Sequence, residues 1–159
     1  MMRWGIFDLD GTLFNPEARR HYAALAKENR IPAARAVLWD KFHAEHTNDP
    51  PYHTEVLLVQ LWEAAGNGVI YLTGRPDNHR ASTELQIAQT GLPLGNYLFM
   101  RPAGISSDTV EYKRRMAQVI LSKIIRPPDH VALVLEDDDR LVQMWREEFG
   151  FTCLQPRKF

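Results

Sequence analysis

The sequence has 159 residues, 45% of them hydrophobic and 25% charged, which is enough for one compact domain with a hydrophobic core. Nineteen Lys and Arg residues against twenty Asp and Glu residues give a formal net charge of -1, which argues against a broad basic surface that holds nucleic acid by charge alone. The single cysteine, Cys153, rules out an intrachain disulfide, and no apolar run approaches the roughly eighteen residues of a membrane span. We therefore expect one domain over residues 1–159 in a cytoplasmic protein without membrane contact.

Five short apolar segments predict strands, and segments with helical periodicity lie between them. The predicted strands are Trp4–Phe7, Val69–Leu72, Tyr97–Met100, Val131–Leu135 and Phe151–Leu154. One of the helical segments would bury a face made of Leu57, Leu58, Leu61, Trp62 and Ala65. Because the strands lack polar alternation, we expect both sheet faces to be covered. This pattern predicts an α/β doubly wound (Rossmann-like) fold with a mostly parallel sheet flanked by helices.

The stretch between the first two predicted strands is too long for one crossover helix. It contains two further helical patterns, at Pro16–Asn29 and Ala34–Glu45, and the segment Thr47–Pro51 then breaks the helix with two prolines. We expect a small helical insertion, resembling a cap, over about residues 15–52.

Two acids, Asp8 and Asp10, follow the first strand directly. Residues two apart in a strand point to the same side, so these carboxylates should converge, and Gly11 then permits a sharp turn. Neighbouring carboxylates repel each other unless a cation lies between them, and an all-oxygen site of this kind suits Mg²⁺.

A second acidic run follows the fourth strand, where Glu136, Asp137, Asp138 and Asp139 succeed five apolar residues. Asp138 or Asp139 could simply cap the next helix, whose N-terminal end favours acids. Glu136 and Asp137 come first after the strand, where ligands of such sheets bind. We favour Asp137 as the metal ligand, with Glu136 in support.

Cationic and hydroxyl side chains also follow predicted strands. Thr73, Gly74 and Arg75 come after the second strand, and a hydroxyl with backbone N–H groups leading into a helix would form an anion-binding corner. Arg101 follows the third strand, and Lys113 lies in the next helix. Together with the acids, these groups are what a phosphoryl group and Mg²⁺ require.

With these motifs the chain resembles the haloacid dehalogenase-like (HAD) phosphohydrolase superfamily. Four motifs occur in order: DLDGT (Asp8–Thr12), Thr73 of LTGR, Lys113, and the acidic pair Glu136-Asp137. Within the superfamily, FDLDGTL, LTGR, FMRP followed by Lys113, and DDDRLVQMWREEFGFTCLQ are most similar to the 3′-phosphatase domain of polynucleotide kinase/phosphatases. No GxxxxGK[ST] phosphate loop occurs in these residues, so we expect them to contain the phosphatase part and not the kinase part.

The resemblance implies a Mg²⁺-dependent phosphomonoesterase that acts on a nucleic-acid 3′-phosphate end. Asp8 would attack phosphorus to form an aspartyl-phosphate, and Asp10 would serve as general acid and base. Mg²⁺ would be held by Asp8, the backbone carbonyl of Asp10 and Asp137, with Glu136 and Asp138 as alternative ligands. By the same resemblance, Thr73 and Lys113 would hold the transferring oxygens, and Arg75 and Arg101 would bind the phosphate or the nucleic-acid backbone.

Three other functions are consistent with parts of the pattern. The substrate could be a mononucleotide or another small phosphate ester, and the domain could be a phosphoryl-accepting receiver or a catalytically silent binding module. Receivers place Lys after the last acids, whereas Lys113 precedes Glu136 here. His43, His46 and His53 lack a clear partner ligand and more simply line a surface or the substrate entrance. Trp39 and Phe42 could stack a base, although helical aromatics more often belong to a core.

Overall fold

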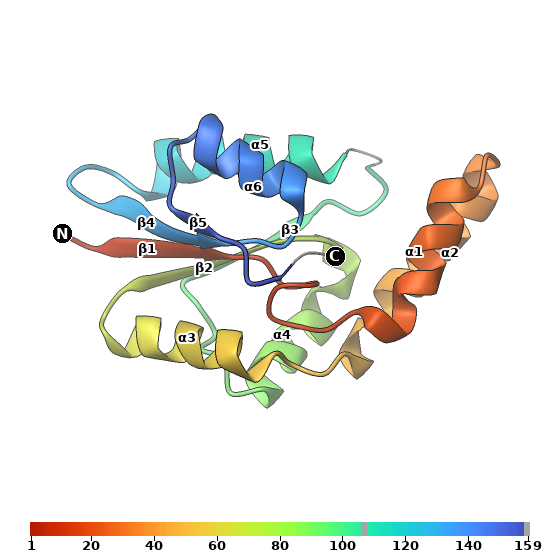
Figure 1. Ribbon diagram of the computed structural model, residues 1–159, viewed down its shortest axis with the longest axis horizontal. Coiled ribbons are helices and arrows are strands. Elements are labelled where there is room, and N and C mark those ends of the chain that lie inside the picture. The colour runs from red at the N-terminus through yellow and green to blue at the C-terminus, as the bar shows by residue number, and fades with distance from the viewer. Residues whose placement is uncertain (106–107, 158–159) are drawn as a thin grey trace.

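The computed structural model describes residues 1–105 and 108–157. Five parallel strands form one sheet in the order β3-β2-β1-β4-β5 (Figure 1). The strands are β1 (Arg3–Phe7), β2 (Gly68–Pro76), β3 (Tyr97–Arg101), β4 (His130–Leu135) and β5 (Cys153–Leu154). The predicted strands and the α/β doubly wound fold are confirmed, although β2 continues to Pro76 and β5 begins only at Cys153.

Helices cover both faces of the sheet (Figure 1). One face carries α5 (Thr109–Val119), the π-helical turn η4 (Ile120–Ile124) and α6 (Asp139–Glu147), and the other carries α3 (His53–Ala64) and α4 (Arg80–Gln89). Successive strand residues point to opposite faces of the sheet. In β1, Ile6 packs in the core under α5 and α6, and Phe7 packs in the core under α3 and α4. Two buried faces explain the unbroken apolar runs in the strands. No helix of the described residues is long and apolar enough to cross a membrane.

The predicted buried face of α3 is wrong in part. Leu57 and Leu61 are 52% and 62% exposed, whereas Val56 and Val59 pack into the core with the partly buried Trp62. Apolar residues occupy more than one side of this helix, so periodicity alone did not fix its rotation. In the structure, Trp62 meets Phe7 edge-on and donates a hydrogen bond to the Gly68 carbonyl.

The stretch between β1 and α3 forms a helical arm, which we define as α1 (Arg20–Glu28) and α2 (Pro32–Ala44). The short helix η1 (Glu17–Arg19) precedes the arm, and η2 (Glu45–Asn48) follows it. Pro32 opens α2, where its fixed backbone angle suits a first helical turn. The arm projects from the body beyond the carboxyl end of β1 (Figure 1).

Candidate active site

The carboxyl ends of β1 and β4 bring two acids side by side. Phe7 pairs with Leu135, so Asp8 and Glu136 are the next residues of adjacent strands, and the Asp8 backbone N–H donates to the Leu135 carbonyl at 3.1 Å. β1 is also where the strand order reverses, because β2 lies on one side of it and β4 on the other. Ligands of open α/β sheets bind at such switch points.

Lys113 of α5 links these two acids in the interior. Its Nζ lies 2.6 Å from Asp8 Oδ1 and 2.7 Å from Glu136 Oε2, and all three side chains are buried. Burial alone would lower the pKa of Lys113, but the charges of Asp8 and Glu136 outweigh it and raise that pKa. Lys113 is therefore fixed as a cation beside Asp8.

Asp137 completes the acidic group. Gly11 has a φ of 86°, and a Cβ on it would collide with the Asp137 carboxylate, so only glycine allows this close approach. The Thr12 hydroxyl lies 2.9 Å from Asp8 Oδ2 and 3.3 Å from Asp137 Oδ1 and can donate its proton to either. Sequence reasoning had assigned no role to Thr12, although it belongs to the DLDGT motif.

The donor set fits a hard divalent cation. Among the described residues, Asp8, Glu136 and Asp137 form a group whose carboxylate oxygens lie within 4.8 Å of one another. Burial and then the charge of Asp8 raise the pKa of both Glu136 and Asp137. One ammonium group does not balance two buried carboxylates and a partly buried third one, and a cation held by oxygen ligands would do so.

Asp138, considered as an alternative metal ligand, instead caps a helix. Its side chain accepts a hydrogen bond from the Arg140 backbone N–H at the start of α6 and pairs with the Arg140 guanidinium at 3.1 Å. It lies outside the acidic group at the sheet edge.

Asp10 does not share its partners with Asp8, contrary to the expected convergence. β1 ends at Phe7 and the chain turns at Gly11, so strand alternation does not extend to Asp10. Its Oδ1 lies 2.6 Å from Nη2 of both Arg19 and Arg75. Burial alone would raise the pKa of Asp10, but Arg75 and Arg19 hold it well below its ordinary value. The Asp10 carboxylate is also outside the acidic group, which leaves its backbone carbonyl as the predicted metal ligand.

The expected role of Arg75 in binding substrate must be revised. Arg75 is fully buried, and besides Asp10 its guanidinium donates to Thr83 and Gln86 of α4 at 3.3 Å and 2.8 Å. A side chain held on all these sides positions Asp10 rather than reaching for a phosphate. The sequence showed its place after an apolar strand, but not its partners.

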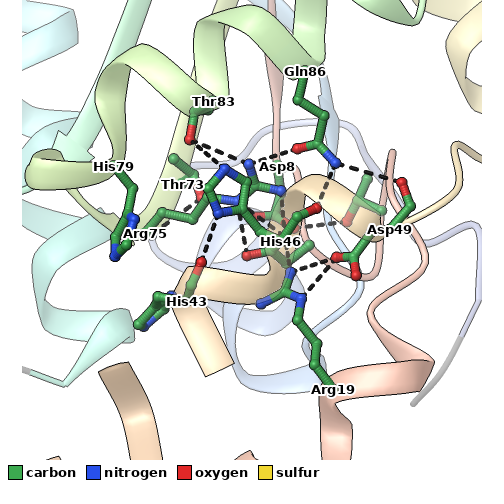
Figure 2. Close-up of polar contacts among 12 residues, drawn as sticks. Asp8, Arg19, His43, His46, Asp49, Thr73, Arg75, His79, Thr83 and Gln86 are labelled. Carbon is green, nitrogen blue, oxygen red and sulfur yellow. Dashed lines mark hydrogen bonds and ion pairs between the residues drawn. The ribbon is translucent and has the colours of Figure 1, made fainter. Parts of the chain in front are cut away.

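A buried hydrogen-bond network that includes Arg19, Asp49 and Gln86 joins the arm to the body (Figure 2). Arg19 donates to Asp49 Oδ2 through Nε at 2.8 Å and Nη2 at 2.6 Å, and to the Phe42 carbonyl at 2.9 Å. Gln86 donates to the His46 carbonyl at 2.7 Å while it accepts from Arg75. Arg19, Asp49 and Gln86 were missed by sequence reasoning, since each is a common residue within a helical or loop segment.

The remaining predicted hydroxyl, Thr73, lies within β2, and the remaining predicted cation, Arg101, ends β3. Thr73 is buried, and its Oγ1 accepts from the Arg75 backbone N–H at 3.2 Å. Because β2 runs on to Pro76, the predicted anion-binding corner at a helix start does not form around Thr73. Arg101 ends β3 half-buried; burial lowers its pKa, against the influence of Tyr112.

Three histidines gather beside the network, two from the arm side and one from η3 (Asp77–His79). The His43 ring centroid is 6.3 Å from that of His79, and the His46 centroid is 5.6 Å from it (Figure 2). Burial lowers the pKa of His43 to about 3, partly opposed by the charge of Asp10. Burial and then Arg75 lower the pKa of His46 to about 4. Both are therefore neutral at pH 7.

The family model of the polynucleotide kinase PNKP phosphatase domain matches residues 3–158. Among solved structures, a chain of the Pnkp1/Rnl/Hen1 RNA repair complex is similar, with a TM-score of 0.74 at 23% identity over 99% of this chain and 43% of that one. The protein thus spans less than half the length of that chain. In a comparison with curated proteins, no match was found.

Two more solved structures share the fold at lower identity. The haloacid dehalogenase-like hydrolase SP0104 from Streptococcus pneumoniae has a TM-score of 0.64 at 12% identity, over 97% of this chain and 84% of that one. The HAD hydrolase YfnB from Bacillus subtilis, in a magnesium-bound structure, has a TM-score of 0.64 at 10% identity, over 99% and 94%.

Proposed function

Because the chain belongs to the PNKP phosphatase-domain family of HAD-type phosphatases, we propose that it removes 3′-phosphate groups from nucleic-acid ends in a Mg²⁺-dependent reaction through an aspartyl-phosphate. The observation that carries this proposal is the buried group at the sheet edge, where Lys113 holds Asp8 Oδ1 at 2.6 Å and Thr12 lies 2.9 Å from Oδ2. These contacts fix the orientation of a carboxylate that would act as nucleophile.

In the first step, a carboxylate oxygen of Asp8 would bond to phosphorus while the bond to the leaving 3′ oxygen breaks. Asp10 would give its proton to that oxygen and then take one from the water that hydrolyses the aspartyl-phosphate. In the free protein, Arg19 and Arg75 favour the ionised form of Asp10. The negative charge of a bound phosphate dianion would raise the pKa of Asp10, against the effect of the two arginines. Substrate binding would therefore favour the protonated Asp10 that the first step needs.

Asp8, Asp137 and the backbone carbonyl of Asp10 would hold Mg²⁺. When bound, the ion would offset the repulsion between the carboxylate nucleophile and the phosphate. Glu136 is engaged by Lys113 at 2.7 Å and by the Asp137 backbone N–H at 3.1 Å, so its role would be to orient Lys113 and the turn that carries Asp137.

Thr73 and Lys113 would contact the transferring oxygens. Thr73 Oγ1 accepts from the Arg75 N–H and can donate its own proton to a phosphoryl oxygen. Arg101, half-buried at the end of β3, would contact the phosphate or the nucleic-acid backbone, now without Arg75. The description of the matched family and the RNA repair complex of the similar chain support a nucleic-acid end as substrate.

The test is phosphate release from a 3′-phosphorylated oligonucleotide, compared with a 5′-phosphorylated oligonucleotide and a 3′-mononucleotide, with Mg²⁺ and with EDTA. We expect Mg²⁺-dependent release with a preference for the 3′-phosphorylated oligonucleotide. Asp8→Asn should abolish release and leave the fold intact by circular dichroism, since the change removes one of three crowded acids. Release from the mononucleotide alone would move the function to small esters. Turnover by Asp8→Asn would exclude the nucleophile assignment.

A further inference from the structure

The aromatic residues of α2 do not belong to either hydrophobic core of the described residues. α2 has thirteen residues, and His43 is the one among them that is buried. Trp39 is half-buried, its ring lies 6.1 Å from that of His43 at an interplanar angle of 25°, and it meets Phe42 edge-on. The core explanation for these aromatics therefore does not apply, and another reason for them is needed.

Arg35, Trp39 and His43 form one row along α2, because residues four apart lie on the same helix face, about 6 Å from one to the next. Along this row exposure rises steadily: His43 is buried, Trp39 half-buried and Arg35 exposed. The row thus leads outward from the body along the arm. We call it the α2 row.

The inner end of the α2 row lies at the predicted leaving-group side of the site. The ring centroid of His43, at this inner end, lies 6.3 Å from that of His79. The neighbouring Phe42 carries the Arg19 guanidinium over its ring at 4.1 Å, and Arg19 in turn holds Asp10 at 2.6 Å. An ester whose oxygen lies beside Asp10 would therefore extend toward His43 and Trp39.

The charge of the arm suits a polyanion. Residues 20–44 contain five Lys or Arg and two Asp or Glu, a net of +3, whereas the whole chain has a net charge of -1. Single-stranded nucleic acid is commonly held by such a combination of aromatic faces and cations along the backbone.

We propose that the α2 row binds the last nucleotides of a single-stranded nucleic-acid 3′ end. The base of the terminal nucleotide stacks on Trp39 beside His43, and Arg35 contacts a backbone phosphate one nucleotide further from the end. This inference rests on the proposed function, since it places the terminal phosphate at Asp8. It makes the α2 row a determinant of preference for polynucleotides over small esters.

The first experiment compares wild-type protein on three substrates: a 3′-phosphorylated oligothymidylate, the same oligonucleotide with an abasic 3′-terminal residue, and p-nitrophenyl phosphate. Loss of the terminal base should lower kcat/KM by about 5-fold to 150-fold, the range that base stacking supplies. The loss should appear mainly in KM, because stacking is present before and after the chemical step.

The second experiment uses variants with matched controls on the opposite face of α2. Trp39→Ala should lower the ratio of kcat/KM for the oligonucleotide to kcat/KM for p-nitrophenyl phosphate by a similar factor. It should also show little difference between the normal and the abasic oligonucleotide. Trp39→Phe should keep most of the wild-type preference for the oligonucleotide. Val37→Ala, at a position 53% exposed, is the apolar control. Arg35→Ala should reduce the slope of log affinity against log salt by about 0.7, and exposed Lys41→Ala should not.

The outcomes separate the two proposals. If wild-type protein cleaves p-nitrophenyl phosphate but not the oligonucleotide, the proposed nucleic-acid substrate is wrong. If it prefers the oligonucleotide but tolerates the abasic end, and Trp39→Ala keeps that preference, the α2 row is not the binding surface and the proposed function stands. The abasic comparison needs no variant, so a poorly folded Trp39→Ala would not prevent the test.

Discussion

Replacing Arg19 by Met would test the buried network that joins the arm to the body. Arg19 is 1% exposed and donates to Asp49 Oδ2 at 2.8 Å and 2.6 Å, and to Asp10 Oδ1 at 2.6 Å. Met fills a similar volume without charge. Asp10 keeps Arg75, whereas Asp49, 6% exposed, would lose its cation.

The cost follows from the charge left behind. Removing one partner of a buried ion pair typically costs about 3–5 kcal/mol, because the other partner remains desolvated. Burial already raises the pKa of Asp49 even with Arg19 present, so the carboxyl group should become protonated in the folded variant. A group with a raised folded-state pKa gains stability as pH falls through that pKa. The deficit of Arg19→Met relative to wild type should therefore shrink toward the unfolded-state pKa of about 3.9.

Urea unfolding at several pH values measures both the size and the pH dependence of this deficit. The companion variant Arg19→Met/Asp49→Asn removes the stranded charge and should recover about 1–2 kcal/mol at pH 7. A loss below about 1 kcal/mol in the single variant, or a double variant no more stable than the single one, would refute the reasoning.

Three further predictions concern buried polar groups. Lys113→Met should destabilise the protein by about 3–5 kcal/mol, because Asp8 and Glu136 lose their cation. In thermal melts, adding Mg²⁺ should raise the melting temperature of this variant more than that of wild type. Equal rises would argue against a cation site there. Between pH 7.5 and 5, wild type should lose about 2 kcal/mol more unfolding free energy than His46→Asn, because unfolded His takes up a proton that the folded state, with its lowered pKa, does not; parallel pH curves would contradict this. Gln86→Leu should lower the free energy of unfolding by about 1–3 kcal/mol, because it removes hydrogen bonds to Arg75 and to the His46 carbonyl. It should also lower kcat more than it raises KM, since Arg75 would no longer be held in place beside Asp10. An unchanged kcat in a destabilised protein would limit Gln86 to a structural role.

The local sequence pattern was enough to predict the fold and the edge of the sheet at which the site lies. Short apolar runs alternating with helical periodicity are consequences of burial on two sheet faces, so the strands and their mostly parallel direction could be predicted before any contact was known. Residues that follow parallel strands meet at one edge, which is why Asp8, Thr73 and Glu136 could be grouped from the sequence. Their catalytic roles stay predictions.

The tertiary structure decided how the charged side chains pair and which helix faces are buried. Arg75 and Asp10 are 65 residues apart, and Arg19 and Asp49 are 30 apart, so no local period relates them. The Asp10 side chain has other partners than Asp8 because β1 ends before it, at Phe7. Arg75 is held beside Asp10 because its guanidinium donates to Gln86 of α4. Sequence pattern reports which residues avoid water, whereas the choice of partner for a buried charge depends on the three-dimensional packing that excludes water around it.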